Sequence, residues 1–281
     1  MKLSIITINY NNREGLQRTI DSVICQTWRD FEWIVIDGGS TDGSRELIEK
    51  YQDHFAYWCS ETDNGVYNAM NKGIAKAKGE YLNFMNSGDC FYEKDTLLVA
   101  FSKKNDADIL YGDCEQIYNK YTRIVSFSSN LNLYDLYRCN ICQQAMFVKK
   151  NMLLQEGFDE SYYVLADWAR WIDAALNGAT FRSLHQIICK YDMNGMSSKN
   201  TELSSLDYQK IMTLYPEMVK ASLLRLHDYE ENIIVQRTLS IINKGRLPRI
   251  IMRLILKVMI NIFCCNKLAN GNHLKWIERG E

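Results

Sequence analysis

Residues 79–89 read GEYLNFMNSGD, and the rest of the sequence is interpreted outward from this stretch. The apolar run over residues 81–85 predicts a buried strand, and the small polar residues 86–88 end it. In an open α/β sheet, ligands bind outside the carboxyl ends of the strands. Asp89 then lies where a carboxylate can hold a divalent cation together with the oxygens of a diphosphate. The same residues also suit a plain turn, so the neighbouring segments must decide between the two.

The composition limits the class of protein. The chain has 281 residues, 47% of them hydrophobic, which is enough for one large domain or for one domain with an appendage. The formal net charge of −1 gives no global attraction to nucleic acid, so no nucleic-acid partner is expected. Nine cysteines without regular spacing indicate a reducing compartment. Cys139 and Cys142 form a CxxC pair, but a zinc site needs further ligands, so the pair is interpreted as chance.

The N-terminus and the apolar runs of the sequence indicate where the protein is located. The apolar run at the N-terminus is too short for a signal peptide, and polar residues 9–12 follow it at once. No uncharged apolar run is long enough to span a bilayer. A cytoplasmic protein is therefore expected.

Apolar runs typical of strands alternate with amphipathic helical patterns in the first part of the chain. The predicted strands cover residues 3–8, 31–36, 55–60 and 81–85, and the predicted helices cover residues 16–24, 45–51 and 66–77. This alternation predicts an α/β fold, with a Rossmann-like, mostly parallel central sheet and helices on both faces. Gly79 is expected to cap the C-terminal end of the third helix.

Each of these four strands ends in polar, turn-forming residues, which indicates a ligand cleft along the carboxyl edge of the sheet. Asp37, Asp63 and Asp89 follow three of the strands and are expected to converge there. Three carboxylates suit a ribose, a base edge and a metal ion. The charge of a phosphate is therefore assigned to the cation and to Lys72. The sequence has no GxGxxG and no GxxxxGK[ST] motif, which argues against a Rossmann dinucleotide site and a P-loop.

After about residue 95 the alternation loosens. An antiparallel hairpin is predicted over residues 115–126, and a strand that begins with two amides over residues 143–148. A helix carries Asp167 near its start, where the helix dipole favours a carboxylate, so a first-turn helix charge explains Asp167 as well as catalysis does. Residues 179–190 are expected to close the sheet region.

The sequence suggests a catalytic domain over residues 1–200 and a helical C-terminal extension over residues 201–281. Within residues 245–265 of the extension, four cations recur at helical spacing on one face of an otherwise apolar segment. These cations are Arg246, Arg249, Arg253 and Lys257. The pattern is typical of a helix that lies in the surface of an anionic membrane, which would place the protein peripherally on the inner face of the cytoplasmic membrane. The alternative is packing on the core or on a second copy of the chain in a homo-oligomer.

Several segments, taken together and in order, resemble the inverting family-2 glycosyltransferases of the GT-A fold, particularly bacterial enzymes of surface-polysaccharide assembly. The matching segments are SIITINYN (4–11), IDGGSTDGS (36–44), SETDNGVYNAMNKG (60–73), GEYLNFMNSGD (79–89) and ADW (166–168). The resemblance covers roughly the first two thirds of the chain and does not extend to the tail after about residue 200.

The resemblance implies transfer of a sugar from a nucleotide-diphospho-sugar to a glycan or polyprenol-linked acceptor in envelope or exopolysaccharide biosynthesis. The residues expected to bind the nucleotide-sugar are Thr7, Asn9, Asp37, Asp63, Lys72, Ser87 and Gly88. The resemblance further implies that Asp89 binds a divalent cation, Mn²⁺ or Mg²⁺, and that Asp167 is the general base. The family motif often carries several aspartates where this chain has Asn86 and Gly88, which leaves the affinity and identity of the metal open.

The chemistry agrees with this set of residues. Displacement of a nucleoside diphosphate needs a Lewis acid at the leaving group and a base for the attacking hydroxyl, and a single displacement inverts the anomeric carbon. Two alternatives stay open. A sugar nucleotidyltransferase usually has a glycine-rich, basic loop after the first strand, whereas residues 9–15 are poor in glycine. A non-catalytic nucleotide-sugar-binding module is compatible with the reduced acidic motif.

Overall fold

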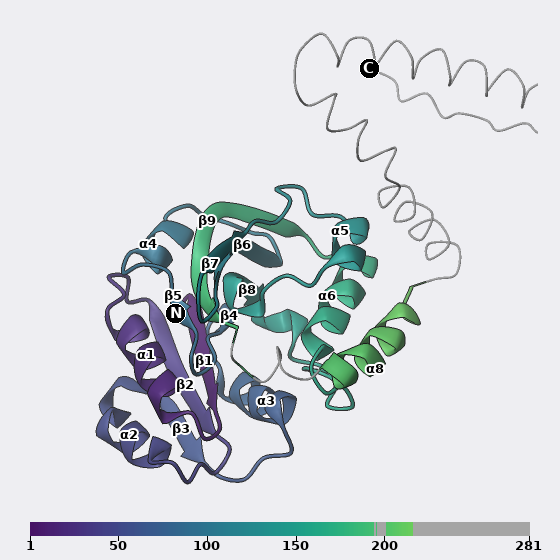
Figure 1. The fold of residues 1–281 in the computed structure, drawn as a ribbon. Helices are drawn as coiled ribbons and strands as arrows, with labels where there is room; N and C mark the ends of the chain where they lie inside the picture. The colour runs from purple at the N-terminus through teal and green to yellow at the C-terminus, as the bar shows by residue number, and fades with distance from the viewer. Residues whose placement is uncertain (194, 196–200, 216–281) are drawn as a thin grey trace, which may run out of the picture. The chain divides into compact units, whose positions relative to one another are not determined.

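The structure is a computed structural model, and it describes residues 1–193, 195 and 201–215. These residues belong to a compact unit that runs over Met1–Pro216, and a second unit covers Glu217–Glu281. The described residues form a nine-stranded sheet with helices on both of its faces (Figure 1). The predicted α/β class with a mostly parallel central sheet is therefore observed.

The elements follow one another in this order. The strands are β1 (Leu3–Asn9), β2 (Phe31–Asp37), β3 (Tyr57–Ser60), β4 (Tyr81–Phe84), β5 (Cys90–Phe91), β6 (Ile109–Ile117), β7 (Thr122–Val125), β8 (Met146–Lys149) and β9 (Phe181–Asp192). The α-helices are α1 (Arg13–Ile24), α2 (Ser44–Lys50), α3 (Val66–Lys76), α4 (Thr96–Ala100), α5 (Leu133–Arg138), α6 (Ala166–Leu176) and α8 (Thr201–Met212). Three short 3₁₀ helices are η1 (Gln52–His54), η2 (Gln143–Ala145) and η3 (Lys150–Met152).

Strands β3, β2, β1 and β4 lie side by side in this order and are all parallel. All seven residues of β1 are buried, because helices cover both faces of the sheet there. Leu3 and Ile5 of β1 pack in one cluster with Leu16 and Ile20 of α1. Helix α3 contacts β1 and β2 from the other face, as Figure 1 shows. This half of the sheet agrees with the alternation in the sequence.

Gly79 does not cap α3, contrary to the prediction. Helix α3 ends at Lys76, and its C-cap residue is Ala77 in an extended conformation. Gly79 is needed for a different reason: a Cβ atom at this position would lie 2.4 Å from the backbone nitrogen of Ser4. The start of β4 passes this close to β1, and only glycine leaves room for the backbone.

The second half of the sheet changes direction. Strand β8 pairs antiparallel to both β4 and β6, and β9 pairs parallel to β6. Strand β7 pairs antiparallel to β6, so the predicted hairpin over residues 115–126 is present. The strand predicted over residues 143–148 was wrong in its first three residues, because η2 precedes β8.

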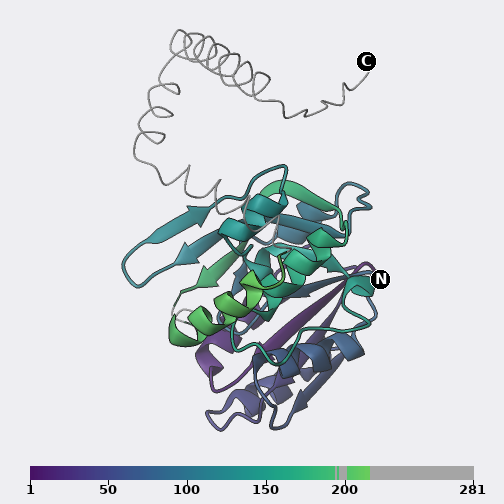
Figure 2. The same cartoon turned by 90° about the vertical axis from the view of Figure 1, so that its right-hand side faces the viewer.

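The C-terminal part of the described chain is helical. The predicted helix over residues 201–215 is present as α8, which packs against α6 and belongs to the first compact unit (Figures 1 and 2). The helix predicted over residues 217–243 and the basic segment over residues 245–265 lie outside the described residues. Within the part of the chain that the structure describes, no helix is both long and apolar enough to cross a membrane.

Candidate active site

The turn after β4 is anchored to helix α1. The Thr19 hydroxyl donates to the backbone carbonyl of Asp89 at 2.7 Å and accepts from the backbone N–H of Gly88 at 3.0 Å. The Asn12 amide donates to the carbonyl oxygen of Ser87 at 3.0 Å. Gly88 has a φ of 105°, which glycine adopts without strain. These hydrogen bonds fix the turn to α1. The feature of the sequence that corresponds to this contact is Thr19, a buried threonine on the apolar face of α1.

The carboxylate of Asp89 points into the protein and is 5% exposed. Its two oxygens accept hydrogen bonds from the Gln144 side-chain amide at 2.6 Å and from the backbone N–H of Asp192 at 2.9 Å. Burial raises the pKa of Asp89 to about 7, because these two bonds offset only part of the desolvation cost. The Asp192 carboxylate, which forms an ion pair with Arg18 at 3.0 Å, also raises the pKa of Asp89.

As it stands, this turn does not fit a preformed metal site. Both oxygens of Asp89 already accept protein hydrogen bonds, and Asn86 and Gly88 bring no carboxylate to the turn. Among the residues that the structure describes, no group of three or more His, Cys, Asp or Glu side chains could hold a metal ion. The assignment of a divalent cation to Asp89 stays a prediction.

The carboxyl ends of β1, β2 and β3 meet at Asp37, which is fully buried. Its oxygens accept from the Asn9 amide at 2.7 Å and from the Ser40 and Ser60 hydroxyls at 2.6 Å each. Burial alone would raise the pKa of Asp37, but the hydrogen bonds from Ser40, Ser60 and Asn9 outweigh it and lower the pKa. Asp37 is therefore ionised at neutral pH and fixes the loop that follows β2.

Asp63 and Lys72 lie near this loop. A Cβ atom placed on Gly38 would be 2.6 Å from the Asp63 carboxylate, so the loops after β2 and β3 are in contact. The Lys72 ammonium forms an ion pair with Glu61 at 2.8 Å, at the surface. The structure thus brings Asn9, Asp37 and Asp63 to one edge of the sheet. The carboxylate of Asp89, the third aspartate expected to converge there, is instead bonded to Gln144 and to the backbone of Asp192.

Thr7 is placed differently. Its side chain is fully buried, donates to the carbonyl of Met85 at 2.8 Å and accepts from the Trp33 indole at 3.0 Å. The hydroxyl of Thr7 thus faces the core, and the role in nucleotide binding that was predicted for it stays a prediction.

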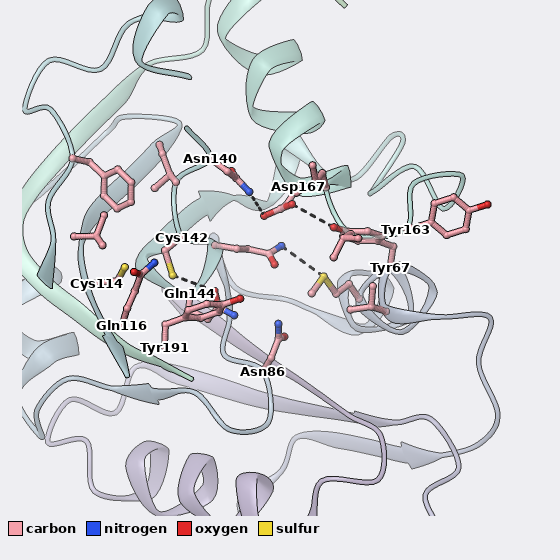
Figure 3. Close-up of a pocket in the computed structure, with 18 residues that line it drawn as sticks. Tyr67, Asn86, Cys114, Gln116, Asn140, Cys142, Gln144, Tyr163, Asp167 and Tyr191 are labelled. Atoms are coloured by element: carbon pink, nitrogen blue, oxygen red, sulfur yellow. Dashed lines mark hydrogen bonds between the residues drawn. The ribbon is translucent and has the colours of Figure 1, made fainter. Parts of the chain in front are cut away.

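A pocket of about 270 Å³ lies between α3, α6 and the strands β6 and β9 (Figure 3). Asp167 lines this pocket and is 8% exposed. Its carboxylate accepts from the Asn140 amide at 2.9 Å and from the Tyr67 hydroxyl at 3.3 Å, as the dashed lines in Figure 3 show. Burial raises the pKa of Asp167, and the bonds from Asn140, the Trp168 N–H and Tyr67 offset this only in part. A buried carboxylate with a raised pKa is a good proton acceptor.

Asn86, the first residue of the turn after β4, also lines the pocket, so the structure brings the turn and Asp167 to the same cavity. The other predicted site residues are not among the described residues that line it: Thr7, Asn9, Asp37, Asp63, Lys72, Ser87, Gly88 and Asp89. The pocket therefore lies on the β6–β9 side of the turn, and the aspartates of β2 and β3 lie on the other side.

The sequence did not indicate three residues that shape the site. Tyr67 lies within the helix predicted over residues 66–77, and its hydroxyl contacts Asp167. Asn140 lies within the CxxC pair that was interpreted as chance. Gln144 was noted as an amide at the start of a strand, and the structure shows that this amide binds Asp89.

Comparison with known proteins identifies the family to which this α/β fold belongs. The profile of the family described as Glycosyl transferase family 2 matches residues 4–159, which is more than half of the chain. The chain therefore belongs to glycosyltransferase family 2, as the sequence motifs indicated. The matched region ends before Asp167.

Two relatives support this assignment. A PGL/p-HBAD biosynthesis glycosyltransferase of Mycobacterium bovis is 32% identical over 211 residues, covering 69% of this chain and 78% of the relative. An uncharacterized glycosyltransferase of Mycobacterium tuberculosis is 34% identical over 206 residues, covering 70% of this chain and 77% of the relative.

Two solved structures share the fold at low sequence identity. TarS of Staphylococcus aureus, residues 1–349 in complex with UDP-GlcNAc, is 21% identical with a TM-score of 0.65, covering 80% of this chain and 70% of that one. The mannosyltransferase PcManGT of Pyrobaculum calidifontis, in complex with GDP-Man and Mn²⁺, is 14% identical with a TM-score of 0.60, covering 92% of this chain and 80% of that one. The predicted GT-A fold is confirmed.

Proposed function

We propose that the protein is an inverting glycosyltransferase that moves a sugar from a nucleotide-diphospho-sugar to an acceptor hydroxyl, with Asp167 as the general base. The observation that carries the proposal is the position of Asp167, which lies in the wall of the pocket with its carboxylate held by Asn140 and Tyr67. The turn after β4 opens on the same pocket through Asn86.

The reaction is a single displacement. The acceptor hydroxyl loses its proton to an oxygen of Asp167 while its own oxygen attacks the anomeric carbon of the donor sugar. The bond from that carbon to the nucleoside diphosphate breaks on the opposite side, which inverts the configuration. The raised pKa of Asp167 favours this proton transfer, since a more basic carboxylate accepts a proton more readily.

The donor is assigned to the edge of the sheet where β1 to β4 end. We assign the base and ribose to the loops that carry Asn9, Asp37 and Asp63, and the diphosphate to Lys72 and to the turn that contains Ser87 and Gly88. Ligands of α/β sheets bind at such an edge, which supports this placement. The complexes of TarS with UDP-GlcNAc and of PcManGT with GDP-Man support a nucleotide-sugar as the donor class.

The acceptor is assigned to the pocket that contains Asp167. A glycan or a polyprenol-linked sugar fits the proposed role in envelope or exopolysaccharide biosynthesis. The support for this role is the mycobacterial relative named for PGL/p-HBAD biosynthesis. We propose a cytoplasmic protein that contacts an anionic membrane through residues 245–265, since the cations Arg246, Arg249, Arg253 and Lys257 share one helical face in the sequence.

The test compares Asp167→Asn with Asp173→Asn, a matched change on the same helix at a carboxylate that pairs with Arg170 at 2.9 Å. Donor binding is measured by calorimetry with UDP and GDP, each with EDTA, Mn²⁺ or Mg²⁺. Turnover is measured as nucleoside diphosphate release from UDP-GlcNAc and GDP-mannose, with water in place of the acceptor hydroxyl. We expect Asp167→Asn to bind the nucleotides like wild type and to lose turnover by about 10²- to 10⁴-fold, the range of a general base.

Each contrary result points to a different function. Normal turnover in Asp167→Asn would remove Asp167 from the mechanism. Nucleotide binding by the wild type without any nucleoside diphosphate release would favour the non-catalytic binding module. Pyrophosphate release from a nucleoside triphosphate and a sugar 1-phosphate would favour the nucleotidyltransferase. Nucleotide binding that is equal in EDTA and in Mn²⁺ would exclude a metal requirement for donor binding.

A further inference from the structure

Helix α6, which carries Asp167 as its second residue, has no cap of its own. Its N-cap residue is Leu165, whose side chain has no oxygen that could accept a backbone hydrogen bond. The N–H groups at the start of a helix nevertheless need acceptors. Two side chains from elsewhere in the chain accept from the N–H groups of the N-cap residue Leu165, of the first helical residue Ala166 and of the two residues before them.

The first acceptor is Asp207 of helix α8. Its carboxylate is 2% exposed. One oxygen accepts from the backbone N–H groups of Tyr163 at 3.0 Å, Val164 at 2.7 Å and Leu165 at 3.0 Å. Three successive N–H groups therefore converge on one buried carboxylate, and charge-assisted bonds of this kind are stronger than neutral ones.

The second acceptor is Tyr67 of helix α3. Its hydroxyl accepts from the backbone N–H of Ala166 at 3.0 Å and donates to Asp167 at 3.3 Å. Together, Asp207 and Tyr67 bind four consecutive N–H groups, from residue 163 to residue 166. The next residue along the chain is Asp167, so these contacts fix where its backbone enters the helix.

Helix α8 makes further contacts along the same segment. The ammonium of Lys210 lies 3.7 Å from the centre of the Tyr162 ring, and the ring of Tyr208 lies 5.7 Å from that of Trp168. Ile211 is fully buried. Because Tyr163, Val164 and Leu165 themselves line the pocket, α8 supports the pocket wall from behind.

We propose that Asp207 is a positioning residue for the transfer reaction: by binding the N–H groups of residues 163–165, it holds the acceptor side of the pocket and the backbone of Asp167 in the productive geometry. This proposal rests on the proposed function of Asp167. Removal of the carboxylate would leave buried N–H groups unpaired, and the segment would move to pair them with water. A displacement of about 1 Å at a catalytic group is enough to reduce a rate by about 10²-fold.

The test uses the full-length protein and three variants. Asp207→Asn keeps the size of the side chain but removes its charge and one acceptor oxygen. Asp207→Glu keeps the carboxylate on a longer side chain. Glu202→Gln is the matched control, since it removes an acidic charge at an exposed position of the same helix. The measurements are amide hydrogen exchange of the peptide that contains residues 163–166, calorimetric binding of UDP and GDP, and nucleoside diphosphate release from UDP-GlcNAc or GDP-mannose.

In Asp207→Asn we expect the amide hydrogens of residues 163–165 to exchange faster than in the wild type. The variant should bind the nucleotide with unchanged affinity and lose turnover by about 10- to 100-fold. Asp207→Glu should recover part of the turnover, and Glu202→Gln should behave like wild type. A purely structural role would lower nucleotide binding and turnover together, through a smaller folded fraction, and would overturn the proposal. Unchanged exchange at residues 163–165 would overturn it as well.

The same measurements distinguish a failure of the proposed function from a failure of the positioning role of Asp207. If the wild type binds UDP or GDP but releases no nucleoside diphosphate from either sugar donor, the role of Asp167 is overturned and the positioning role of Asp207 with it. If the wild type turns over and Asp207→Asn does so equally well, only the positioning role is overturned. If Asp207→Asn does not fold, the comparison is made with Asp207→Glu, for which wild-type exchange and wild-type turnover together would overturn the proposal.

Discussion

At the scale of single residues, two buried aspartates near the sheet edge have opposite electrostatic properties. Asp37 accepts hydrogen bonds from three side chains, which outweigh its burial and lower its pKa. Asp89 accepts from Gln144 and from one backbone N–H, and the effect of burial on its pKa outweighs the effect of these two bonds. The pKa of Asp89 therefore rises to about 7, so this side chain changes charge near neutral pH.

This difference predicts how Asp89 affects stability. The pKa of Asp89 is about 7 in the folded state, against an ordinary value of 3.8. Between these values the folded state binds more protons than the unfolded state, so stability falls as the pH rises. Relative to Asp89→Asn, the wild-type free energy of unfolding should fall by up to about 4 kcal/mol between pH 4 and pH 7, and stay level above pH 7.

Urea unfolding of both proteins in EDTA, at one-unit pH steps from 4 to 8, measures this difference. The comparison with Asp89→Asn cancels the contributions of the other carboxylates, which titrate in both proteins. A difference that does not vary with pH would mean that Asp89 titrates as an ordinary aspartate does.

The sequence predicted where Asp89 lies but not what it contacts. The end of an apolar run followed by small residues is a local signal, and it located the turn after β4 correctly. The partners of Asp89 lie 55 and 103 residues further along the chain, at Gln144 and Asp192. Their pairing depends on how β8 and β9 join the sheet, and no local pattern records this.

At the scale of elements, the four parallel strands and their helices were predicted from apolar runs that alternate with helical periodicity, and β1, β2 and β4 are indeed buried along almost their whole length. The error at Gly79 shows the limit of that method. A glycine after a helix suggests a cap, whereas here it allows β4 to pass close to the backbone of Leu3 and Ser4. Sequence patterns report the preferences of one segment and do not report the approach of two segments.

Gly79→Ala should therefore destabilise the fold. The added Cβ atom would lie 2.4 Å from the Ser4 nitrogen and 2.5 Å from the Leu3 carbonyl carbon, both of them backbone atoms. We expect a loss of about 1–3 kcal/mol in the free energy of unfolding, the usual range for overpacking. Gly178→Asn is the control, since Gly178 has open space around it and asparagine tolerates its φ of 81°.

Thermal and urea unfolding of both variants measure this prediction. Equal stability of Gly79→Ala and wild type would mean that β4 can shift away from β1 at no cost. If Gly178→Asn lost as much stability as Gly79→Ala, crowding at the start of β4 would not be the cause.

At the scale of the whole molecule, the compact unit extends beyond the predicted domain. The sequence suggested an end at residue 200, because the family resemblance stops there. In the structure, α8 packs on α6, and Asp207 and Ile211 are buried in the first unit, which runs over Met1–Pro216. We propose that the catalytic domain includes α8.

Two truncations test this boundary. A chain that ends at residue 216 should unfold cooperatively and bind UDP or GDP like the full-length protein. A chain that ends at residue 200 should melt about 10 °C lower or more, because it loses the burial of Ile211 and the acceptor for residues 163–165. Equal melting temperatures of the two truncations would restore the boundary at residue 200.

The chain that ends at residue 216 also tests the membrane proposal. The full-length protein should sediment with liposomes that contain phosphatidylglycerol, and the chain that ends at residue 216 should not. If neither sediments, residues 245–265 have another role, such as oligomerisation.

The hydrogen bond between Asp89 and the backbone of Asp192 has a consequence for the order of folding. The two residues are 103 positions apart, so a ribosome that adds about 5–20 residues per second needs roughly 5–20 s to supply the second after the first. During that time the parallel strands β1 to β4 can assemble, because their partners are already synthesised. The turn that carries Asp89, although its residues are made early, is among the last of the described parts of the chain to reach its final hydrogen bonding.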